Sequence, residues 1–235
     1  MHLLIPAAGM GRRMGSDRNK LLLTLRGQPI IAWTLLAAEA AATLDWIGII
    51  CQPSDRPFLE SLLPTLALTK PITFIPGGDT RQASVYNGLQ NLPSGVERVL
   101  IHDGARCLAT PGLFDRCGAD LHTCPGLIAA VPVKDTIKVV GTDGIIVATP
   151  DRATLWAAQT PQGFAVPLLK QAHDRGLAEG WAVTDDAALF EKIGLPVTIV
   201  PGEETNLKIT TPSDLAIAER ILSDRELDDS SSSVG

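Results

Sequence analysis

Cysteines are few in this sequence, and no two of them have the spacing of a CxxC motif. The chain has 235 residues, far more than the small domains that disulfides hold together. We therefore expect buried or half-buried thiols in a reducing compartment. A catalytic cysteine or a zinc site is the less favoured interpretation of the four thiols, which are Cys51, Cys107, Cys117 and Cys124.

Long apolar runs are also absent. No stretch approaches the roughly 20 apolar residues that a membrane-spanning helix needs. The first residues, MHLLIPAAGMGRR, place apolar residues ahead of the basic ones, which is not the order of a signal peptide. We expect a soluble, cytoplasmic protein that does not bind a membrane.

Positive charge is in the minority. The chain has 20 Lys and Arg residues against 26 Asp and Glu residues, and a formal net charge of -6. Proteins dedicated to nucleic acids usually present a basic surface, so no nucleic-acid partner is expected. Hydrophobic residues make up 45% and charged residues 20%, the balance of a globular domain with a sizeable core. Local clusters of positive charge are therefore more informative than the total.

What the sequence does contain is an alternation of apolar runs with helical patterns. The runs are apolar throughout, as strands buried on both faces are; they cover residues 3–7, 46–51, 72–75, 98–102, 126–133 and 197–200. Helices are predicted between them, over residues 29–41, 55–66, 80–92 and 110–123. Asp55 and Thr110 are predicted to cap their helices, each with a proline in the first turn. The order of elements predicts an α/β fold with a doubly wound sheet.

The alternation breaks at residues 134–150. Two β-rich runs surround GTDG there, and Asp143–Gly144 is typical of a hairpin turn. An isolated two-stranded ribbon is marginally stable in water, so we expect this arm to project from the sheet and pack on a second subunit. Residues 1–223 are interpreted as a single domain, and the acidic, serine-rich tail 224–235 is predicted to be disordered.

A glycine-rich loop with the sequence PAAGMGRRMGSDRNK follows the first predicted strand, at residues 6–20. It lies at the carboxyl edge of the sheet, where α/β proteins bind ligands. Its small residues 7–9 let backbone N–H groups approach an anion closely. The loop is not a Walker A motif, because no GK[ST] follows at the right spacing, and it is not GxGxxG, because the interval from Gly11 to Gly15 is wrong. An anion-binding loop and an ordinary surface loop both fit this pattern.

Two further motifs follow predicted strand ends. GGDTRQAS at residues 77–84 fits either a ligand-binding loop or a plain turn into a capped helix. In IHDGAR, Asp103 fits a metal ligand, a group that orients a substrate hydroxyl, or the ion-pair partner of Arg106. Downstream, Thr184 fits a helix cap and Lys208 a solvent-facing side chain. Each of the remaining motifs is weak alone; these are KDTIK, DRATLW, AQTPQ, VTDDA and NLKIT.

Taken in order, these motifs resemble those of the 2-C-methyl-D-erythritol 4-phosphate cytidylyltransferases, and the resemblance extends from residue 3 to about residue 222. It implies a Rossmann-like fold, with a mostly parallel sheet that has helices on both faces. It also implies a homodimer joined through the β-arm at 134–150, with shared active sites. The implied reaction joins CTP to methylerythritol phosphate and releases pyrophosphate, with Mg²⁺, in the non-mevalonate route to isoprenoid precursors.

The resemblance also implies roles for single residues. Arg13 and Lys20 match the pair that stabilises the transition state, and Arg152 and Lys208 match the pair that positions the substrate phosphate. The nucleotide contacts correspond to Ala7, Ala8, Gly9, Gly78, Asp79 and Ser84. The methylerythritol-phosphate pocket corresponds to Asp103, Arg106, Thr136, Thr160 and Thr184. Of these residues, Thr136 and Arg152 are expected to reach the site of the other subunit.

This sequence departs from the family pattern at four positions. Asn19 stands where proline usually precedes the lysine, and Leu21 stands where glutamine usually follows it. In the motif HDAARP of the family, Gly104 replaces the first alanine and Cys107 the proline. None of these changes removes a charge or hydroxyl that the mechanism needs, so they affect the expected rigidity of the loops.

The chemistry itself limits which groups are needed. Attack on the α-phosphorus of CTP builds charge on phosphate oxygens, and fixed cations stabilise it. A phosphate monoester has its second pKa near ~6, so the attacking oxygen needs no general base. His102 is accordingly expected to be structural. Mg²⁺ usually keeps several waters, so few protein ligands are expected, with Asp103 the best candidate.

Three alternatives remain open. The chain could act on another polyol phosphate such as ribitol 5-phosphate, transfer a purine nucleotide, or bind CTP without catalysis as a sensor. A sensor has no need for a second phosphate clamp, which is what Arg152 and Lys208 would form together with Lys20.

Overall fold

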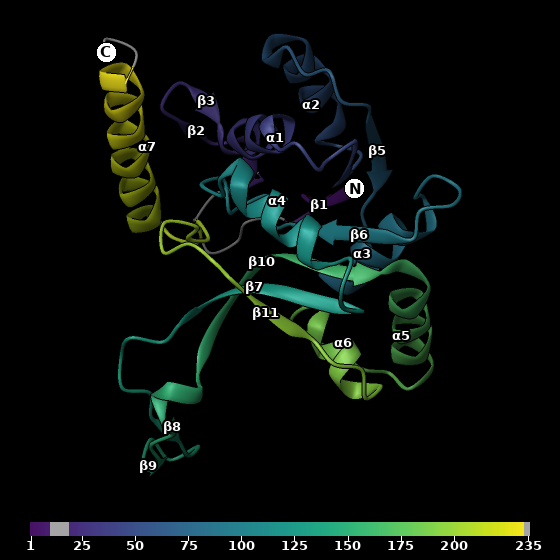
Figure 1. Cartoon of the computed structure of the whole chain (residues 1–235), viewed down its shortest axis with the longest axis vertical. Coiled ribbons are helices and arrows are strands. Elements are labelled where there is room, and N and C mark those ends of the chain that lie inside the picture. Colours follow the sequence, from purple (N-terminus) through teal and green to yellow (C-terminus); the bar gives the residue numbers. More distant parts are fainter. Residues whose placement is uncertain (10–18, 233–235) are drawn as a thin grey trace.

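A seven-stranded sheet forms the centre of the computed structural model, which describes residues 1–9 and 19–232, with side chains to residue 227 (Figure 1). The strand order is β11-β7-β10-β6-β1-β4-β5. Neighbours run parallel except at β10, which is antiparallel to both β6 and β7. The mostly parallel sheet predicted from the sequence is confirmed. Its strands are β1 (His2–Pro6), β4 (Trp46–Cys51), β5 (Ile72–Pro76), β6 (Arg98–Ile101), β7 (Gly126–Pro132), β10 (Trp156–Ala165) and β11 (Thr198–Pro201).

Strand β10 was not predicted, although the other six strands of this sheet were. Its sequence, WAAQTPQGFA, has polar residues, a proline and a glycine where the other strands are apolar. The pairing of β10 with β7 shifts register between Ala158 and Gln162. Such a bulge tolerates a proline, because ladder hydrogen bonding is already interrupted there. The polar residues of this bulge lie at the candidate site described below.

Helices cover both faces of the sheet, as predicted (Figure 1). Leu3 and Ile5 of β1 contribute to one apolar cluster, and Leu4 to the other. Because successive side chains of a strand point to opposite faces, one buried strand supplies both clusters. The first cluster also takes in α1 (Ile30–Ala40), α2 (Arg56–Leu62), α4 (Pro111–Asp120) and α7 (Pro212–Ser232). The second takes in α3 (Arg81–Gln90), α5 (Val166–Ala178) and α6 (Ala187–Lys192).

The predicted helix caps have different outcomes. Thr110 caps α4 as predicted, since its Oγ1 accepts the N–H of Leu113 at 3.2 Å. The prediction that Asp55 caps α2 is wrong, because its side chain makes no cap hydrogen bond. Its Oδ2 instead accepts a hydrogen bond from Asn19 Nδ2 at 2.8 Å. A partner 36 residues away has therefore replaced the local one.

The arm at residues 134–150 projects from the body, as Figure 1 shows. It carries β8 (Val139–Val140) paired antiparallel with β9 (Ile146–Ala148). The predicted turn is present, with Gly144 at φ 81°, a conformation that favours glycine. Between the arm and β10 lies the short helix η4 (Arg152–Thr154). The arm exposes several apolar side chains, which are Val139, Val140, Ile145, Ile146 and Val147.

The predicted disorder of the tail is wrong for the residues that the structure describes. Helix α7 continues to Ser232, past the predicted boundary at Asp224. Arg220 and Asp224 form an ion pair one helical turn apart, and Arg225 Nη2 donates to Leu108 O at 2.8 Å. Glu226 binds Arg26 at 2.6 Å. These contacts stabilise a segment whose acidic, serine-rich composition favours disorder.

Three of the four thiols are buried: Cys51, Cys107 and Cys117. Burial raises the pKa of Cys51 to about 11 and that of Cys107 and Cys117 to about 12, so they are protonated at neutral pH. This agrees with the expected structural thiols. Within residues 1–9 and 19–232, no helix is long and apolar enough to cross a membrane.

The remaining short elements lie beside the sheet. They are η2 (Lys20–Leu22), β2 (Thr24–Leu25), β3 (Gln28–Pro29) and η3 (Leu63–Leu66).

Candidate active site

A cavity of about 650 Å³ opens at the carboxyl ends of β1, β5 and β6. Six segments of the chain line it, as expected for the ligand edge of an α/β sheet. Eight residues selected from the sequence are in this lining: Ala8, Gly9, Lys20, Gly78, Asp79, Ser84, Asp103 and Lys208. The predicted contact Ala7 is buried and is not part of the lining; its N–H donates to Ile50 O at 2.7 Å and extends the β1–β4 ladder.

The loop that follows β1 and the loop that follows β5 are in close contact at this cavity. A Cβ atom on Gly77 would collide with the Cβ of Ala8, so the loops meet at a position where only glycine fits. Gly78 N–H donates to Ser84 Oγ at 3.0 Å, and Thr80 Oγ1 caps α3 by accepting the N–H of Ala83 at 3.0 Å. The first turn of α3 therefore faces the cavity, and a helix N-terminus favours phosphate groups.

A smaller cavity of about 170 Å³ adjoins the first. Among its lining residues are four that the sequence assigned to a substrate pocket: Asp103, Arg106, Thr160 and Thr184. The two cavities share Arg81, Asp103 and Lys208. We call these three residues the shared wall. Ligands bound on its two sides would meet there.

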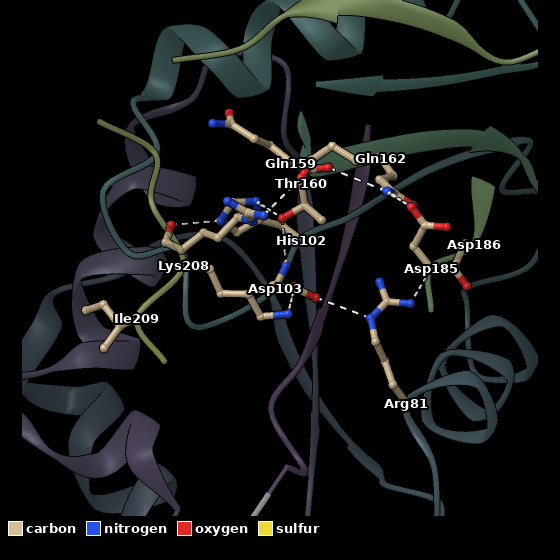
Figure 2. A network of polar contacts seen from close by, with 12 residues as sticks. Arg81, His102, Asp103, Gln159, Thr160, Gln162, Asp185, Asp186, Lys208 and Ile209 are labelled. Carbon is tan, nitrogen blue, oxygen red and sulfur yellow. Dashed lines mark hydrogen bonds and ion pairs between the residues drawn. The ribbon is translucent and has the colours of Figure 1, made fainter. Parts of the chain in front are cut away.

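Asp103 is at the centre of the shared wall, between Lys208 and Arg81 (Figure 2). Lys208 Nζ lies 2.6 Å from Asp103 Oδ2, and Arg81 Nε lies 3.3 Å from Asp103 Oδ1. Burial raises the pKa of Asp103, but the charges of Arg81 and Lys208 outweigh it and hold the pKa well below its usual range. The carboxylate stays ionised and fixes two cations beside the cavity. Lys208 therefore does not simply face solvent.

Arg81 belongs to this wall, and the sequence analysis missed its role. Its Nη1 lies 2.8 Å from Oδ2 of Asp186, whose side chain is 1% exposed. Asp186 Oδ1 lies 3.2 Å from His173 Nε2. Burial raises the pKa of Asp186, but Arg81 and the hydrogen bond with His173 more than reverse this effect. Among the described residues, the buried Nη2 of Arg81 has no hydrogen-bond partner.

His102 is structural, as predicted. Its Nε2 lies 3.0 Å from the carbonyl oxygen of Arg106, so this nitrogen carries the proton. Its Nδ1 then accepts from the Thr160 hydroxyl, whose oxygen accepts the N–H of Asp103 at 3.0 Å. Burial lowers the pKa of His102 to about 4, and the ring is neutral at pH 7. Thr160 thus lines the smaller cavity while its hydroxyl is used to support Asp103.

Arg106 is held by backbone carbonyls rather than by a carboxylate. Its Nη1 donates to Asn206 O at 2.8 Å and its Nη2 to Ala158 O at 3.2 Å. Within the described part of the chain, no ion pair joins it to Asp103, so the alternative of an Asp103–Arg106 pair is wrong. Beside it, Gln162 Nε2 binds Asp185 Oδ2 at 2.8 Å. Asp185 Oδ1 in turn accepts the N–H of Ala188 in the first turn of α6. From the sequence, Thr184 was the residue considered as a cap for this helix.

Lys20 reaches the larger cavity from η2. Its Nζ donates to Ile209 O at 2.6 Å, next to Lys208 in the chain. The carbonyl group thus directs the Lys20 ammonium toward the segment that carries Lys208.

Besides Ala7, two predicted residues of the described chain, Thr136 and Arg152, are not part of the lining of either cavity. Thr136 and Arg152 are exposed and lie at the arm, where Arg152 Nη1 donates to Lys134 O at 3.0 Å. Neither lines the cavities of its own chain. Arg13 lies outside the described residues.

The described residues include no group of three His, Cys, Asp or Glu side chains that could hold a metal ion. Asp103 offers a single buried carboxylate at the shared wall, and cations face both of its oxygens. This donor set fits a Mg²⁺ ion held mainly by phosphates and water, and not one enclosed by protein ligands.

Comparison with known proteins gives a consistent result. The family model for 2-C-methyl-D-erythritol 4-phosphate cytidylyltransferase (IspD) matches residues 1–224. A curated protein of that name from Nostoc sp. is 70% identical over 226 residues, covering 96% of this chain and 99% of the relative. One from Synechococcus elongatus is 67% identical, with coverage of 96% and 97%.

Solved structures agree with this match. The 4-diphosphocytidyl-2C-methyl-D-erythritol synthase of Anaerococcus prevotii has a TM-score of 0.84 at 31% identity, and covers 94% of this chain and 97% of its own. The 2-C-methyl-D-erythritol 4-phosphate cytidylyltransferase of Thermus thermophilus has a TM-score of 0.73 at 32% identity, with the same coverage.

Proposed function

This chain belongs to the 2-C-methyl-D-erythritol 4-phosphate cytidylyltransferase family, and on that basis we propose that the two adjoining cavities are where its reaction takes place. It transfers a cytidylyl group from CTP to 2-C-methyl-D-erythritol 4-phosphate and releases pyrophosphate, in isoprenoid precursor synthesis. The observation that carries the placement is the shared wall, because it brings fixed cations to the boundary between two ligand cavities.

We assign CTP to the larger cavity. The small residues Ala8, Gly9 and Gly78 leave room for the nucleotide, and the first turn of α3 faces its phosphates. The polyol phosphate is assigned to the smaller cavity, beside Arg106 and Thr184. In this arrangement the two substrates meet at Asp103, Lys208 and Arg81.

Lys20 and Lys208 are the proposed catalytic cations of the described chain. As the phosphate oxygen attacks the α-phosphorus, negative charge grows on the equatorial oxygens and on the leaving pyrophosphate. Ammonium groups already fixed by Ile209 O and by Asp103 stabilise that charge without reorganising. Arg13 is proposed to join them, on the resemblance alone.

No side chain is needed as a general base. The attacking phosphate is already largely dianionic at neutral pH, since its second pKa is near ~6. The nearest histidine of the described site, His102, is fully buried and hydrogen-bonded through both ring nitrogens.

Mg²⁺ is the proposed cofactor. It would be held by the phosphates of CTP and by water, with Asp103 as its one protein carboxylate, and would neutralise phosphate charge. Removal of free divalent ions with EDTA is expected to abolish pyrophosphate release, and added Mg²⁺ to restore it. Full activity in EDTA would contradict this proposal.

We also propose a homodimer with shared sites, joined through the arm. Thr136 lies on the arm and Arg152 in η4 just after it, and neither lines the cavities of its own chain, so we assign both to the site of a second copy. A mixture of inactive Arg13→Ala and Arg152→Ala proteins is expected to regain part of the activity. Confirmed heterodimers without activity would argue against shared sites.

The direct test is pyrophosphate release from CTP and 2-C-methyl-D-erythritol 4-phosphate with Mg²⁺. Ribitol 5-phosphate is expected to react with a far lower kcat/KM; the reverse order would overturn the assignment.

Lys20→Ala is expected to lower kcat by roughly 100-fold or more, the scale of a lost transition-state donor. If the wild type and this variant both lacked turnover and differed only in CTP affinity, the protein would be a sensor.

A further inference from the structure

Asn19 precedes the catalytic candidate Lys20, and its side chain makes three hydrogen bonds. Its Nδ2 donates to Ala7 O at 2.7 Å and to Asp55 Oδ2 at 2.8 Å. Its Oδ1 accepts the N–H of Leu21 at 3.1 Å. The residue is only 7% exposed. One amide group therefore joins the end of β1, the start of α2 and the first turn of η2.

These bonds fix the backbone that carries Lys20. Leu22 N–H donates to Asn19 O at 3.0 Å, and Asn19 is the N-cap of η2. Leu21, the next residue, is buried in the apolar cluster that contains β1. On the other side, Ala7 is bound to Ile50 O in the sheet. The Cα of Lys20 is thus held relative to the central strands, while Ile209 O holds its ammonium.

The backbone of Asn19 has φ -57° and ψ 120°. Proline is restricted to φ near -65°, so the φ of Asn19 is one that a proline also adopts. In this chain, side-chain hydrogen bonds hold a backbone conformation that a proline ring would fix covalently.

We propose that Asn19 is a positioning residue for catalysis, which acts by holding Lys20 against the end of β1. The inference rests on the proposed function of Lys20. Misplacement of a catalytic group by about 1 Å can cost on the order of 100-fold in rate, so the loss of these bonds should appear in kcat.

A double-mutant cycle tests this role. Wild type, Asn19→Ala, Lys20→Ala and the double variant are compared for kcat and for KM of both substrates. Asn19→Ala is expected to lower kcat about tenfold or more, with KM of the polyol phosphate nearly unchanged. In the Lys20→Ala background the same change is expected to lower kcat less than about twofold, because the group that it positions is gone.

Asn87→Ala is the matched control. Asn87 Nδ2 also donates to a carbonyl at a strand end, Pro76 O at 3.1 Å, but it does not contact η2. The Asn87→Ala variant should therefore have the kcat of the wild type. If thermal unfolding shows that Asn19→Ala folds poorly, Asp55→Ala is used in its place, because it removes only one of the three hydrogen bonds of Asn19. Asp55→Ala is expected to cause a smaller loss of kcat, and only when Lys20 is present.

Equal losses of kcat with and without Lys20, or no loss in Asn19→Ala, would overturn the proposal. These outcomes are distinct from a failure of the proposed function, in which Lys20→Ala itself would leave kcat unchanged.

Discussion

At the scale of single residues, Arg81 forms two ion pairs in different surroundings. Its guanidinium binds Asp103 at the cavities and the fully buried Asp186 behind them. A planar group with several fixed donors suits such a bridge, whereas a lysine offers a single point charge. The position of Asp103 therefore depends on an ion pair that does not itself face the larger cavity.

Replacement of Arg81 by methionine is expected to destabilise the fold by about 3 kcal/mol at pH 7, because it leaves the Asp186 carboxylate buried without its cation. Asp186 has a lowered pKa in the folded state, so its contribution is full above the unfolded value of ~3.9 and is lost as pH falls through the folded value. In Arg81→Met, burial without a cation should raise the pKa of Asp186, so its carboxylate takes up a proton between pH 7 and about pH 4 while that of the wild type stays ionised. The difference in stability from wild type, measured by urea unfolding, should therefore shrink over this range.

The control for this variant is Arg220→Met, which breaks an exposed pair with Asp224 and should change stability by less than about 1 kcal/mol. A difference between Arg81→Met and wild type that does not vary with pH would mean that lost packing, not charge, causes the effect.

Single residues also show where sequence reasoning stops. Small residues and cations near strand ends were recognisable, since Gly78, Lys20 and Lys208 lie in motifs that resemble a known family. The pair of Arg81 with Asp186 spans 105 residues, so no local pattern predicts it. The residues around Asp186, VTDDA, fit a carboxylate in the first turn of a helix as well as they fit a buried ion pair.

At the scale of elements, apolar runs predicted the buried strands well because burial on both faces leaves a local signature. Strand β10 lacks that signature. Its central residues Gln159, Thr160 and Gln162 are buried and form hydrogen bonds with groups from distant segments, such as Asp103 N–H for Thr160. A polar strand of this kind is recognisable only once its partners are known.

The turn between β5 and α3 gives a prediction at this scale. A Cβ on Gly78 would lie 2.7 Å from the Cβ of Ala83, so Gly78→Ala must displace the first turn of α3. We expect a rise in KM for CTP of roughly tenfold, as overpacking of 1–3 kcal/mol would produce. Steady-state kinetics with varied CTP measure it.

Gly112→Ala is a suitable comparison for Gly78→Ala. A Cβ on this glycine of α4 would meet its nearest neighbour, Arg116, at an ordinary 3.6 Å. Its KM for CTP should equal that of the wild type. An unchanged KM in Gly78→Ala would contradict the placement of the nucleotide beside this turn.

At the scale of the whole molecule, the arm is the feature that a single chain does not explain. Its apolar side chains are exposed over both short strands, whereas most apolar residues of the central strands are buried. Such a surface is costly in water and is typical of a contact with another protein. The apolar arm and the position of Arg152 both favour a second copy of this chain.

Ile146 is 57% exposed in the arm. Ile146→Asp is expected to weaken self-association at least about tenfold, because it would bury an unpaired charge at the contact. Analytical ultracentrifugation would detect the shift toward monomer, together with a loss of activity. Leu177→Asp changes a residue 74% exposed on α5 and should leave the mass unchanged. Identical association of both variants would exclude the arm as the contact.

The wall shared by the two cavities has a consequence for how the substrates are measured. One carboxylate and its two cations line both cavities, so with the substrates placed as proposed, occupation of either cavity changes the electrostatic field at the other. Linkage then requires reciprocity: the factor by which CTP alters the affinity for the polyol phosphate equals the factor by which the polyol phosphate alters the affinity for CTP. Neither dissociation constant is a property of one site alone.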